Sequence, residues 1–329
     1  MTPSPREMRA VWLEGTPRWN LAHPRPTLAP GEALIRVRVV GLCATDAELA
    51  RGYKKFAGVP GHEFVGDVIA APDAPAWEGQ RVVGEINIAC GACATCRVGR
   101  PAHCPHRHTL GIEGWDGALA DYLTLPIANL HAVPPTLPDD VAVFTEPLAA
   151  ACEILQQIHV HPTDRVLVVG DGKLGLLCAQ VLALTGCDLT VIGHHAEKLA
   201  LLERRGIATT LRATQVSPGA DIVVEATGSP QGFVIARRLV RPRGTLVLKT
   251  TYAGDLPGDM TGLVVDEVRV IGSRCGPFPP ALRLLTQGLV DVLPMIDARY
   301  PFADALHALE HATRRGVMKV LVVMETDTP

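Results

Sequence analysis

Short apolar runs alternate with longer, partly apolar segments from Pro162 to about residue 276. The short runs are typical of buried strands, and the longer segments are typical of helices that pack on a sheet. A chain that alternates strands and helices in this way forms a parallel sheet with helices on both faces, the doubly wound α/β fold. The pattern predicts strands at 166–169, 188–192, 221–225, 244–249 and 268–272, with helices near 174–185, 196–205 and 230–240.

A different pattern covers the first 145 residues. Ala33–Val40 alternates as a half-buried strand does, and Glu63–Ala70 and Arg81–Ile88 are further strand candidates. Prolines and glycines interrupt most of the gaps, which favours a β-rich domain with many loops. A six-stranded doubly wound sheet is complete by about residue 275, so we expect the tail to return to the first domain. The predicted organisation is a β-rich domain over 1–145, an α/β domain over 146–276 and a returning segment over 277–329.

Composition narrows the class of protein. A chain of 329 residues exceeds one ordinary core, and 47% hydrophobic against 20% charged residues indicates a well-buried globular protein. The net charge of −3 gives no basic surface for nucleic acid, and no apolar run is long enough to span a membrane. Met1–Met8 lacks the apolar core of a signal peptide, so we expect a cytoplasmic protein. Nine cysteines in such a chain favour metal or catalytic use over disulfides.

A glycine-rich turn follows the predicted strand 166–169 and has the spacing G-x-G-x-x-G. In such a turn the first glycine permits the tight reversal, the second lets the backbone approach a pyrophosphate, and the third lets the helix pack on the strand. The helix N-terminus then faces the phosphates. The alternative is a plain strand-to-helix turn, but the strand before it and the helix after it favour dinucleotide binding. The expected phosphate-binding residues are Gly170, Gly172, Lys173, Leu174 and Gly175.

Four cysteines lie close together in a loop of the first domain, at Cys90, Cys93, Cys96 and Cys104. Four thiolates can close a tetrahedron around Zn²⁺ and leave no open position, which is typical of a structural zinc site. Metal binding then contributes folding energy to a lobe, about residues 88–106, that has little core of its own. An iron–sulfur cluster and unrelated free thiols are the alternatives.

Three further motifs complete a series. They are Cys43-Ala-Thr45-Asp46, then Gly61-His62-Glu63, and Thr145-Glu146-Pro147 ahead of the glycine turn. In this order, and together with the four-cysteine lobe, they resemble the zinc-containing medium-chain dehydrogenase/reductase family, in its alcohol, polyol and threonine dehydrogenase branches. The resemblance covers essentially the whole chain. It implies a GroES-like catalytic domain followed by a Rossmann nucleotide-binding domain, and a homodimer or homotetramer.

The resemblance assigns roles around a catalytic zinc. Cys43 and His62 match zinc ligands, and Glu63 matches the acidic neighbour of that histidine, which ligates zinc in some family members. Glu146 stands where many alcohol dehydrogenases place a cysteine ligand, and it matches the glutamate that the polyol and threonine branches have at this position. Whether Glu63, Glu146 or a water completes the zinc shell stays open. A cysteine, histidine and carboxylate set with one open position is what a catalytic zinc requires.

Proton handling is assigned in the same way. Thr45 matches the hydroxyl that passes the substrate proton toward solvent. Asp46 matches the carboxylate that orients the imidazole of His62, as metal-bound histidines usually require. Glu48 stands where several alcohol dehydrogenases end the proton relay with a histidine. The relay therefore runs through Glu48 or directly to water, and a solvated carboxylate is the simpler alternative for Glu48.

At the nucleotide end, members that prefer NAD place an acidic residue after the second strand, where it binds the ribose hydroxyls. Here that position is Gly193. The lack of a carboxylate, together with the nearby His194, His195 and Lys198, favours NADP(H) over NAD(H).

Three residues further along the chain match other cofactor contacts of the family. Thr227 matches the loop that lines the nucleotide, and Thr251 lies near the expected place of the nicotinamide amide. Lys319 matches a basic residue that reaches back to the cofactor, with an exposed strand-opening lysine as the alternative.

The predicted activity is reversible oxidation of an alcohol to a carbonyl compound by hydride transfer to a nicotinamide cofactor. Two zinc ions per chain are expected, one catalytic and one structural. A metal-free enone or quinone reductase on the same fold, with one zinc, is the alternative enzyme. A non-catalytic NADPH-binding protein is the alternative outside enzymes. The small-molecule substrate is not identified by the sequence.

Overall fold

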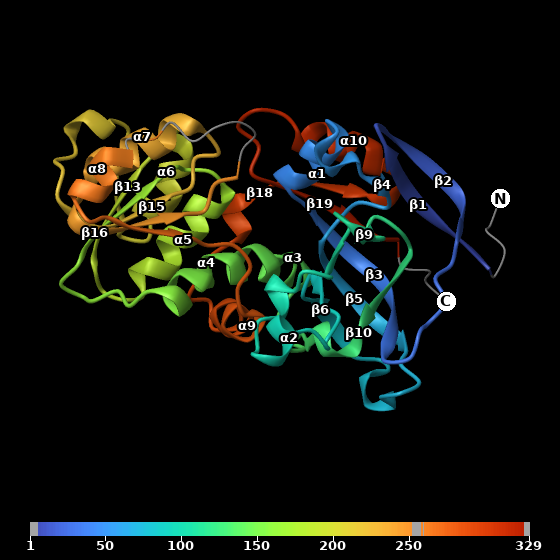
Figure 1. Cartoon of the computed structure of the whole chain (residues 1–329). Coiled ribbons are helices and arrows are strands. Elements are labelled where there is room, and N and C mark those ends of the chain that lie inside the picture. The colour runs from blue at the N-terminus through green and yellow to red at the C-terminus, as the bar shows by residue number, and fades with distance from the viewer. Residues whose placement is uncertain (1–5, 252–257, 259, 326–329) are drawn as a thin grey trace. The chain divides into compact units, whose positions relative to one another are not determined.

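A computed structural model describes residues 6–251, 258 and 260–325 of the chain. The chain folds into two compact units. Unit 1 comprises Met1–Glu146 with Leu282–Pro329, and unit 2 comprises Pro147–Ala281. The chain passes between them within two helices, α4 (Thr145–Gln157) and α9 (Phe278–Thr286). Each unit has its own sheets, which Figure 1 shows as arrows.

Unit 1 is built on a mixed sheet in which the order is β11-β6-β5-β3-β19-β18, with β10 also paired to β3. Smaller sheets contain β2-β1-β4 and β7-β8-β9. The strands of the large sheet are β3 (Glu32–Leu42), β5 (Glu63–Ala70), β6 (Arg81–Gly84), β10 (Tyr122–Pro126), β11 (Leu130–Ala132), β18 (Ile296–Pro301) and β19 (Lys319–Val323). The others are β1 (Glu7–Glu14), β2 (Thr16–Pro24), β4 (Ala57–Gly58), β7 (Asn87–Ile88), β8 (His108–Leu110) and β9 (Gly114–Trp115). The helices are α1 (Ala44–Ala50), α2 (Ala94–Arg97), α3 (Asp139–Ala142) and α10 (Ala305–Ala312).

Two expectations for unit 1 need correction. The strand predicted at Ala33–Val40 is longer, and Arg36 is its only exposed position between Glu32 and Leu42. It is not half-buried, because β5, β10 and β19 all pair with β3 and place it in the middle of the sheet. The strand predicted at Arg81–Ile88 is divided into β6 and β7, which belong to different sheets. The antiparallel pairing of β19 with β3 brings the end of the chain into this sheet.

Unit 2 contains a six-stranded sheet in the order β14-β13-β12-β15-β16-β17, and every pairing in it is parallel. This order defines the doubly wound fold, so the predicted fold class is confirmed. Helices lie on both sides of the sheet in Figure 1. The strands are β12 (Arg165–Val169), β13 (Asp188–Ile192), β14 (Ala208–Thr210), β15 (Ala220–Glu225), β16 (Val240–Leu248) and β17 (Arg269–Gly272). The helices are α5 (Lys173–Ala183), α6 (Ala196–Glu203), α7 (Pro230–Leu239) and α8 (Met260–Val265).

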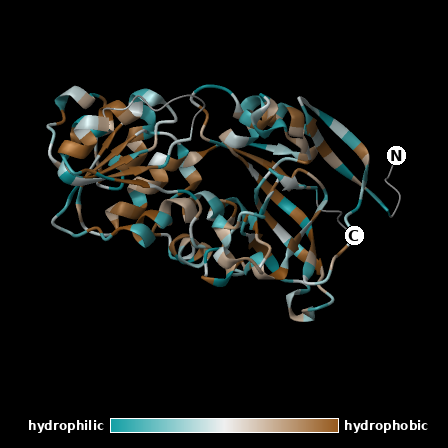
Figure 2. Cartoon of the chain, viewed as in Figure 1, coloured by the Kyte–Doolittle hydropathy of each residue, from teal (hydrophilic) through white to brown (hydrophobic). Residues whose placement is uncertain are grey.

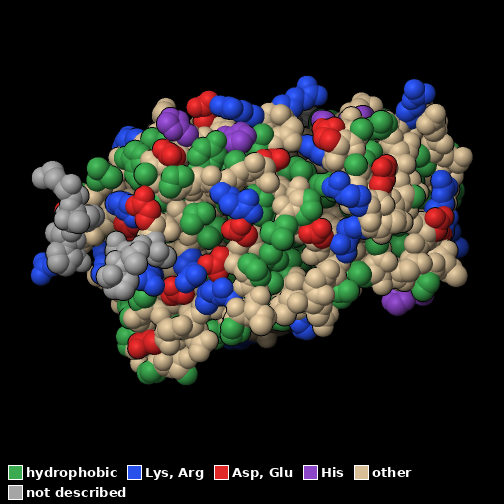
Figure 3. All heavy atoms as spheres, turned by 180° about the vertical axis from the view of Figure 1, so that it is seen from behind, with side chains coloured by type: hydrophobic (Ala, Val, Ile, Leu, Met, Phe, Trp, Pro, Cys, Tyr) green, Lys and Arg blue, Asp and Glu red, His purple; other side chains and the backbone are tan. Residues whose placement is uncertain are grey.

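The core of unit 2 follows from its sequence. The central strands consist almost wholly of apolar residues, seen as brown arrows in Figure 2, because helices cover both of their faces. One cluster packs Phe233 of α7 against Leu167, Val169 and Val223 of the sheet. On the surface drawn in Figure 3, acidic and basic side chains are interspersed. None of the helices in the described part of the chain is long and apolar enough to cross a membrane.

Candidate active site

The candidate catalytic metal group lies where two neighbouring strands of unit 1 meet a helix. Cys43 follows the end of β3 and begins α1, and His62 directly precedes β5. Because Gly41 of β3 pairs with Glu63 of β5, these side chains come together. One ligand atom from each of Cys43, His62 and Glu63 lies within 4.8 Å of the others. His62 and Glu63 are buried and Cys43 is half-buried, so Cys43 is the most solvent-accessible of the three ligands.

Asp46 holds the two loops of this group together. Its carboxylate accepts the N–H of Cys43 at 2.8 Å and the N–H of Gly61 at 3.3 Å, and it is 2% exposed. The Nδ1 atom of His62 is 3.4 Å from Asp46 Oδ1 and makes no well-formed hydrogen bond. The imidazole therefore turns Nδ1 toward the carboxylate, and Nε2 is the nitrogen left for a metal.

The electrostatics of the group favour a cation. Burial by itself would lower the pKa of His62, but the Asp46 carboxylate and the Cys43 sulfur outweigh burial and raise that pKa well above its ordinary value. Burial likewise opposes ionisation of Asp46, yet His62 and the two N–H donors leave the pKa of Asp46 below its ordinary value. Positive charge is thus stabilised at this point, and a soft sulfur, an imidazole and a carboxylate suit Zn²⁺. The residues fit a zinc ion.

Thr45 and Glu48 lie on α1 but in different surroundings. The hydroxyl of Thr45 is half-buried and 3.7 Å from the sulfur of Cys43. Glu48 is exposed and pairs with Arg51 on the same helix. The structure therefore brings Thr45 to the metal group and places Glu48 on the outer surface of α1.

A buried ion pair adjoins the metal group. Lys319 opens β19, is 1% exposed, and donates from Nζ to the carboxylate of Glu63. Its ammonium also lies 5.3 Å from the ring centroid of Phe144. Burial alone would lower the pKa of Lys319, but Glu63, Cys43 and Glu146 raise it above its ordinary value. The alternative of an exposed lysine is therefore wrong. Glu146, half-buried at the start of α4, adds to the same field but lies outside the group of three ligand atoms.

The four cysteines of the lobe form the second metal group. Their neighbouring sulfur atoms lie 3.5 to 3.8 Å apart. Zinc–sulfur bonds of about 2.3 Å in a tetrahedron place the sulfurs about 3.8 Å apart, so the set fits a tetrahedral ion. Backbone N–H groups of Ala92 and Cys93 lower the pKa of Cys90 to about 6, which favours the thiolate that a metal needs. Sulfurs that converge on one point argue against unrelated free thiols.

The glycine turn in unit 2 leaves room for a phosphate. Gly170 has φ of +122°, and a Cβ on it would meet the carbonyl oxygen of Ala226 at 2.5 Å. A Cβ on Gly175 would lie 2.1 Å from the carbonyl oxygen of Gly170, so α5 packs directly on the turn. At Gly172, which begins α5, an added Cβ would meet nothing within 4 Å. Open space in front of a helix N-terminus fits a pyrophosphate.

The residues expected at the adenosine end are close together in sequence but differ in exposure. Gly193 follows β13 and is buried, His194 is exposed, and His195 is half-buried. Lys198 is only 7% exposed on α6, so its ammonium does not extend into solvent as a surface lysine would. Sequence reasoning missed Asp171, whose carboxylate accepts the N–H groups of His194 and His195 at 2.6 and 2.7 Å.

The loops after β15 and β16 lie beside each other. Thr227 donates its hydroxyl to Glu225 at 2.6 Å, and the N–H of Gly228 bonds the hydroxyl of Thr250 at 3.0 Å. Thr251, the next residue, is exposed.

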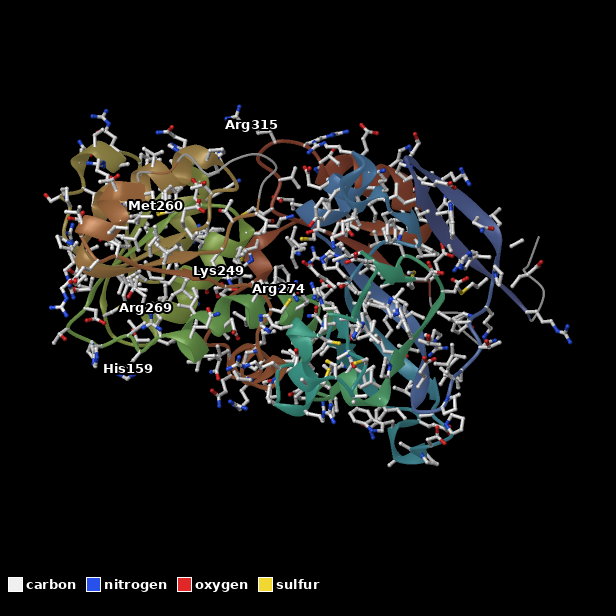
Figure 4. All side chains as sticks on the ribbon, viewed as in Figure 1. His159, Lys249, Met260, Arg269, Arg274 and Arg315 are labelled. Atoms are coloured by element: carbon white, nitrogen blue, oxygen red, sulfur yellow. The ribbon has the colours of Figure 1, made fainter. Side chains whose placement is uncertain are left out.

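Lys249, between β16 and these threonines, is another residue that sequence reasoning missed. It is 8% exposed and donates to the carbonyl of Ala150, the hydroxyl of Ser273 and the carbonyl of Arg274, at 2.6, 3.1 and 3.2 Å. Figure 4 labels Lys249 and Arg274 inside unit 2. The ammonium joins the end of β16 to α4 and to the segment after β17, and a lysine next to an apolar strand is the only sequence signal for it.

A β-rich unit with a cysteine, histidine and carboxylate group, and a doubly wound unit with a glycine turn, define a zinc-dependent dehydrogenase. Comparison with known proteins agrees. Residues 29–135 match the alcohol dehydrogenase GroES-like domain, and residues 174–287 match the zinc-binding dehydrogenase family. The chain belongs to the family of zinc-binding alcohol and polyol dehydrogenases. It is an oxidoreductase that interconverts an alcohol and a carbonyl compound with a nicotinamide cofactor, as the sequence predicts.

Individual relatives match over almost their whole length. The L-threonine 3-dehydrogenase of Streptomyces avermitilis is 30% identical, over 92% of this chain and 95% of the relative. The erythritol/L-threitol dehydrogenase of Mycolicibacterium smegmatis is 29% identical, over 93% and 94%. A zinc-binding dehydrogenase of Sinorhizobium meliloti, solved with NADP bound, has a TM-score of 0.87 at 28% identity and covers 96% of this chain and 99% of its own. The metal-free reductase and the non-catalytic protein are not favoured by these relatives.

Proposed function

We propose that this enzyme oxidises a secondary alcohol of a small polyol or hydroxy acid at the group formed by Cys43, His62 and Glu63. The observation that carries the proposal is the convergence of these three ligand atoms within 4.8 Å over the buried carboxylate of Asp46. Relatives named for erythritol, threitol and threonine support this substrate class. When bound, zinc would lower the pKa of the alcohol and the nicotinamide would accept the hydride.

The chain's own residues then have distinct tasks. Cys43 and His62 would hold the metal, and Glu63, Glu146 or a water would complete its shell. Asp46 is a positioning residue, because its carboxylate accepts the N–H groups of Cys43 and Gly61 and faces Nδ1 of His62 at 3.4 Å. Thr45, whose hydroxyl is 3.7 Å from the sulfur of Cys43, takes up the proton that the substrate hydroxyl releases. From the half-buried Thr45 that proton passes to Glu48, on the exposed surface of α1, or directly to water.

The cofactor occupies the glycine turn of unit 2. Gly170, Gly172, Lys173, Leu174 and Gly175 offer the pyrophosphate a helix N-terminus with open space before it. We place Thr227 and Thr251 along the nucleotide, because their loops follow β15 and β16 at the carboxyl end of the sheet. Lys319 acts on the catalytic group through Glu63, and a cofactor contact for it stays a prediction. The two-zinc content, a homodimer or homotetramer and a cytoplasmic location are predictions of the same kind.

The test compares turnover with cofactor binding in two cysteine variants. Nicotinamide absorbance is followed across polyols, hydroxy acids, hydroxy amino acids and simple alcohols. Cys43→Ser is expected to lose turnover of the best substrate while it still binds the reduced cofactor. Cys187→Ser, a half-buried cysteine on the other unit, is the control and should keep both. Full activity in Cys43→Ser would contradict a catalytic metal at this group.

A further inference from the structure

Gly193 directly follows β13. At this position, about 20 residues after the glycine turn, a dinucleotide-binding fold usually provides the carboxylate that binds the adenosine ribose. From sequence alone, this gap removes the group that would repel the 2′-phosphate of NADP. In the structure the gap is filled from the turn itself. A Cβ built on Gly193 would lie 2.5 Å from Asp171 Oδ2. A larger side chain at 193 and the carboxylate of Asp171 therefore exclude each other, and Asp171 occupies the place.

Asp171 is held there by the backbone N–H groups of His194 and His195 and by the His195 ring. Oδ2 accepts the N–H of His194 at 2.6 Å and the N–H of His195 at 2.7 Å, and Nδ1 of His195 is 3.1 Å from both carboxylate oxygens. The side chain is 8% exposed. Burial by itself would raise the pKa of Asp171, but the hydrogen bonds from His195 and His194 keep that pKa below its ordinary value. The group is thus a fixed anion between the first and second glycines of the turn.

This arrangement leaves few hydrogen-bond donors or cations to bind a 2′-phosphate. The two backbone N–H groups that would bind an anion after β13 already bind one. The ring of His195 faces the same carboxylate, and Lys198 is buried on α6. A ribose hydroxyl, by contrast, needs an acceptor. A carboxylate offers about four acceptor positions, and Oδ1 of Asp171 accepts only the His195 ring among the contacts of the described residues.

We propose that Asp171 selects NAD(H) over NADP(H), because its carboxylate accepts the 2′-hydroxyl of the adenosine ribose and repels a 2′-phosphate. The assignment rests on the proposed dehydrogenase function and reverses the preference that the sequence favoured. Asp171 supplies, from the glycine turn, the carboxylate that is missing after β13.

The test measures binding of NADH and NADPH to the zinc-loaded enzyme without substrate, by quenching of protein fluorescence and by calorimetry. Wild type is expected to bind NADH more tightly. Asp171→Asn keeps the shape and removes the charge. Since hydrogen bonds to a charged group contribute about 1.5–3 kcal/mol, we expect the NADH-to-NADPH preference to fall by roughly tenfold to a hundredfold. Asp164→Asn, which neutralises the carboxylate bonded to the N–H of His161 in the same unit, is the matched control and should not change the ratio.

Each outcome has one meaning. A wild type that binds NADPH as tightly as NADH would overturn the assignment alone and leave the dehydrogenase function in place. An Asp171→Asn variant that folds, as judged by its melting temperature, and keeps the wild-type ratio would also overturn it. If wild type binds neither cofactor, the proposed function fails and the assignment fails with it. If Asp171→Asn does not fold, His195→Ala is measured in its place. A retained preference for NADH would support Asp171. A gain in NADPH binding as large as that expected for Asp171→Asn would instead assign cofactor selection to the imidazole and overturn the proposal.

Discussion

The buried pair between Lys319 and Glu63 gives a sharp test of the metal group. Both side chains are 1% exposed, and they are 256 residues apart in sequence. Lys319→Met keeps the length of the side chain and removes its charge, so the carboxylate of Glu63 is left buried without its cation. Removing one partner of a buried pair costs about 3–5 kcal/mol. For a unit of this size each kcal/mol lowers the melting temperature by about 2–4 °C, so a decrease of roughly 6–20 °C is expected.

The size of this loss should depend on zinc. Because the ligand atom of Glu63 lies in the same group as those of Cys43 and His62, a bound Zn²⁺ also compensates the carboxylate. The destabilisation by Lys319→Met is therefore expected to be smaller in the zinc-loaded enzyme than after chelation. Adding Glu63→Gln to Lys319→Met removes the unpaired charge and should restore part of the lost stability, which a double-mutant cycle measures.

The control is an exposed pair in the same unit. Lys54 and Glu113 are 2.6 Å apart with side chains 34% and 48% exposed, and a surface pair of this kind contributes about 0–1 kcal/mol. Urea unfolding of Lys54→Met should give a loss in that range. If Lys319→Met costs no more than Lys54→Met with or without zinc, the ion pair does not stabilise the site and the reasoning is refuted.

Two further predictions concern groups away from the catalytic metal. Lys249→Met should lower the free energy of unfolding of unit 2 by about 1–3 kcal/mol, because two carbonyls and a hydroxyl lose their buried donor. Chemical denaturation followed by circular dichroism measures this loss, and an unchanged denaturation midpoint would contradict the prediction. After zinc removal, iodoacetamide near neutral pH should modify Cys90, whose pKa is about 6, well before Cys178, whose pKa burial raises to about 11. Peptide mass spectrometry follows both cysteines, and equal rates would show that the backbone N–H groups of the lobe do not activate Cys90.

The sequence predicts the parts of this molecule that depend on local spacing. The glycine turn and the four-cysteine lobe are short-range patterns, so their geometry follows from which residues lie a few positions apart. The metal-binding roles of Cys43 and His62 are also predicted by short motifs. The order of these motifs along the chain matches the family, and the pairing of Gly41 with Glu63 brings them together in space. The apolar runs predict the central strands because both faces of a parallel sheet are covered.

The contacts that sequence reasoning missed depend on pairings between distant segments. Lys319 opens β19 and Glu63 opens β5, and both of these strands pair with β3. No local pattern in the sequence predicts this register. Asp171 occupies a variable position of the glycine motif, and its role appears only once Gly193 is seen to leave space for it. Lys198 is expected to meet a 2′-phosphate because it lies a few residues after Gly193, but on α6 it is buried, 7% exposed.

The most direct test of the account is the zinc content of wild type and of Cys43→Ser, measured by mass spectrometry of the purified, buffer-exchanged chains. Two zinc ions are expected per wild-type chain and one in the variant, with the remaining ion held by the four-cysteine lobe. One zinc in both proteins would mean that Cys43, His62 and Glu63 hold no metal, and would contradict the catalytic site described above.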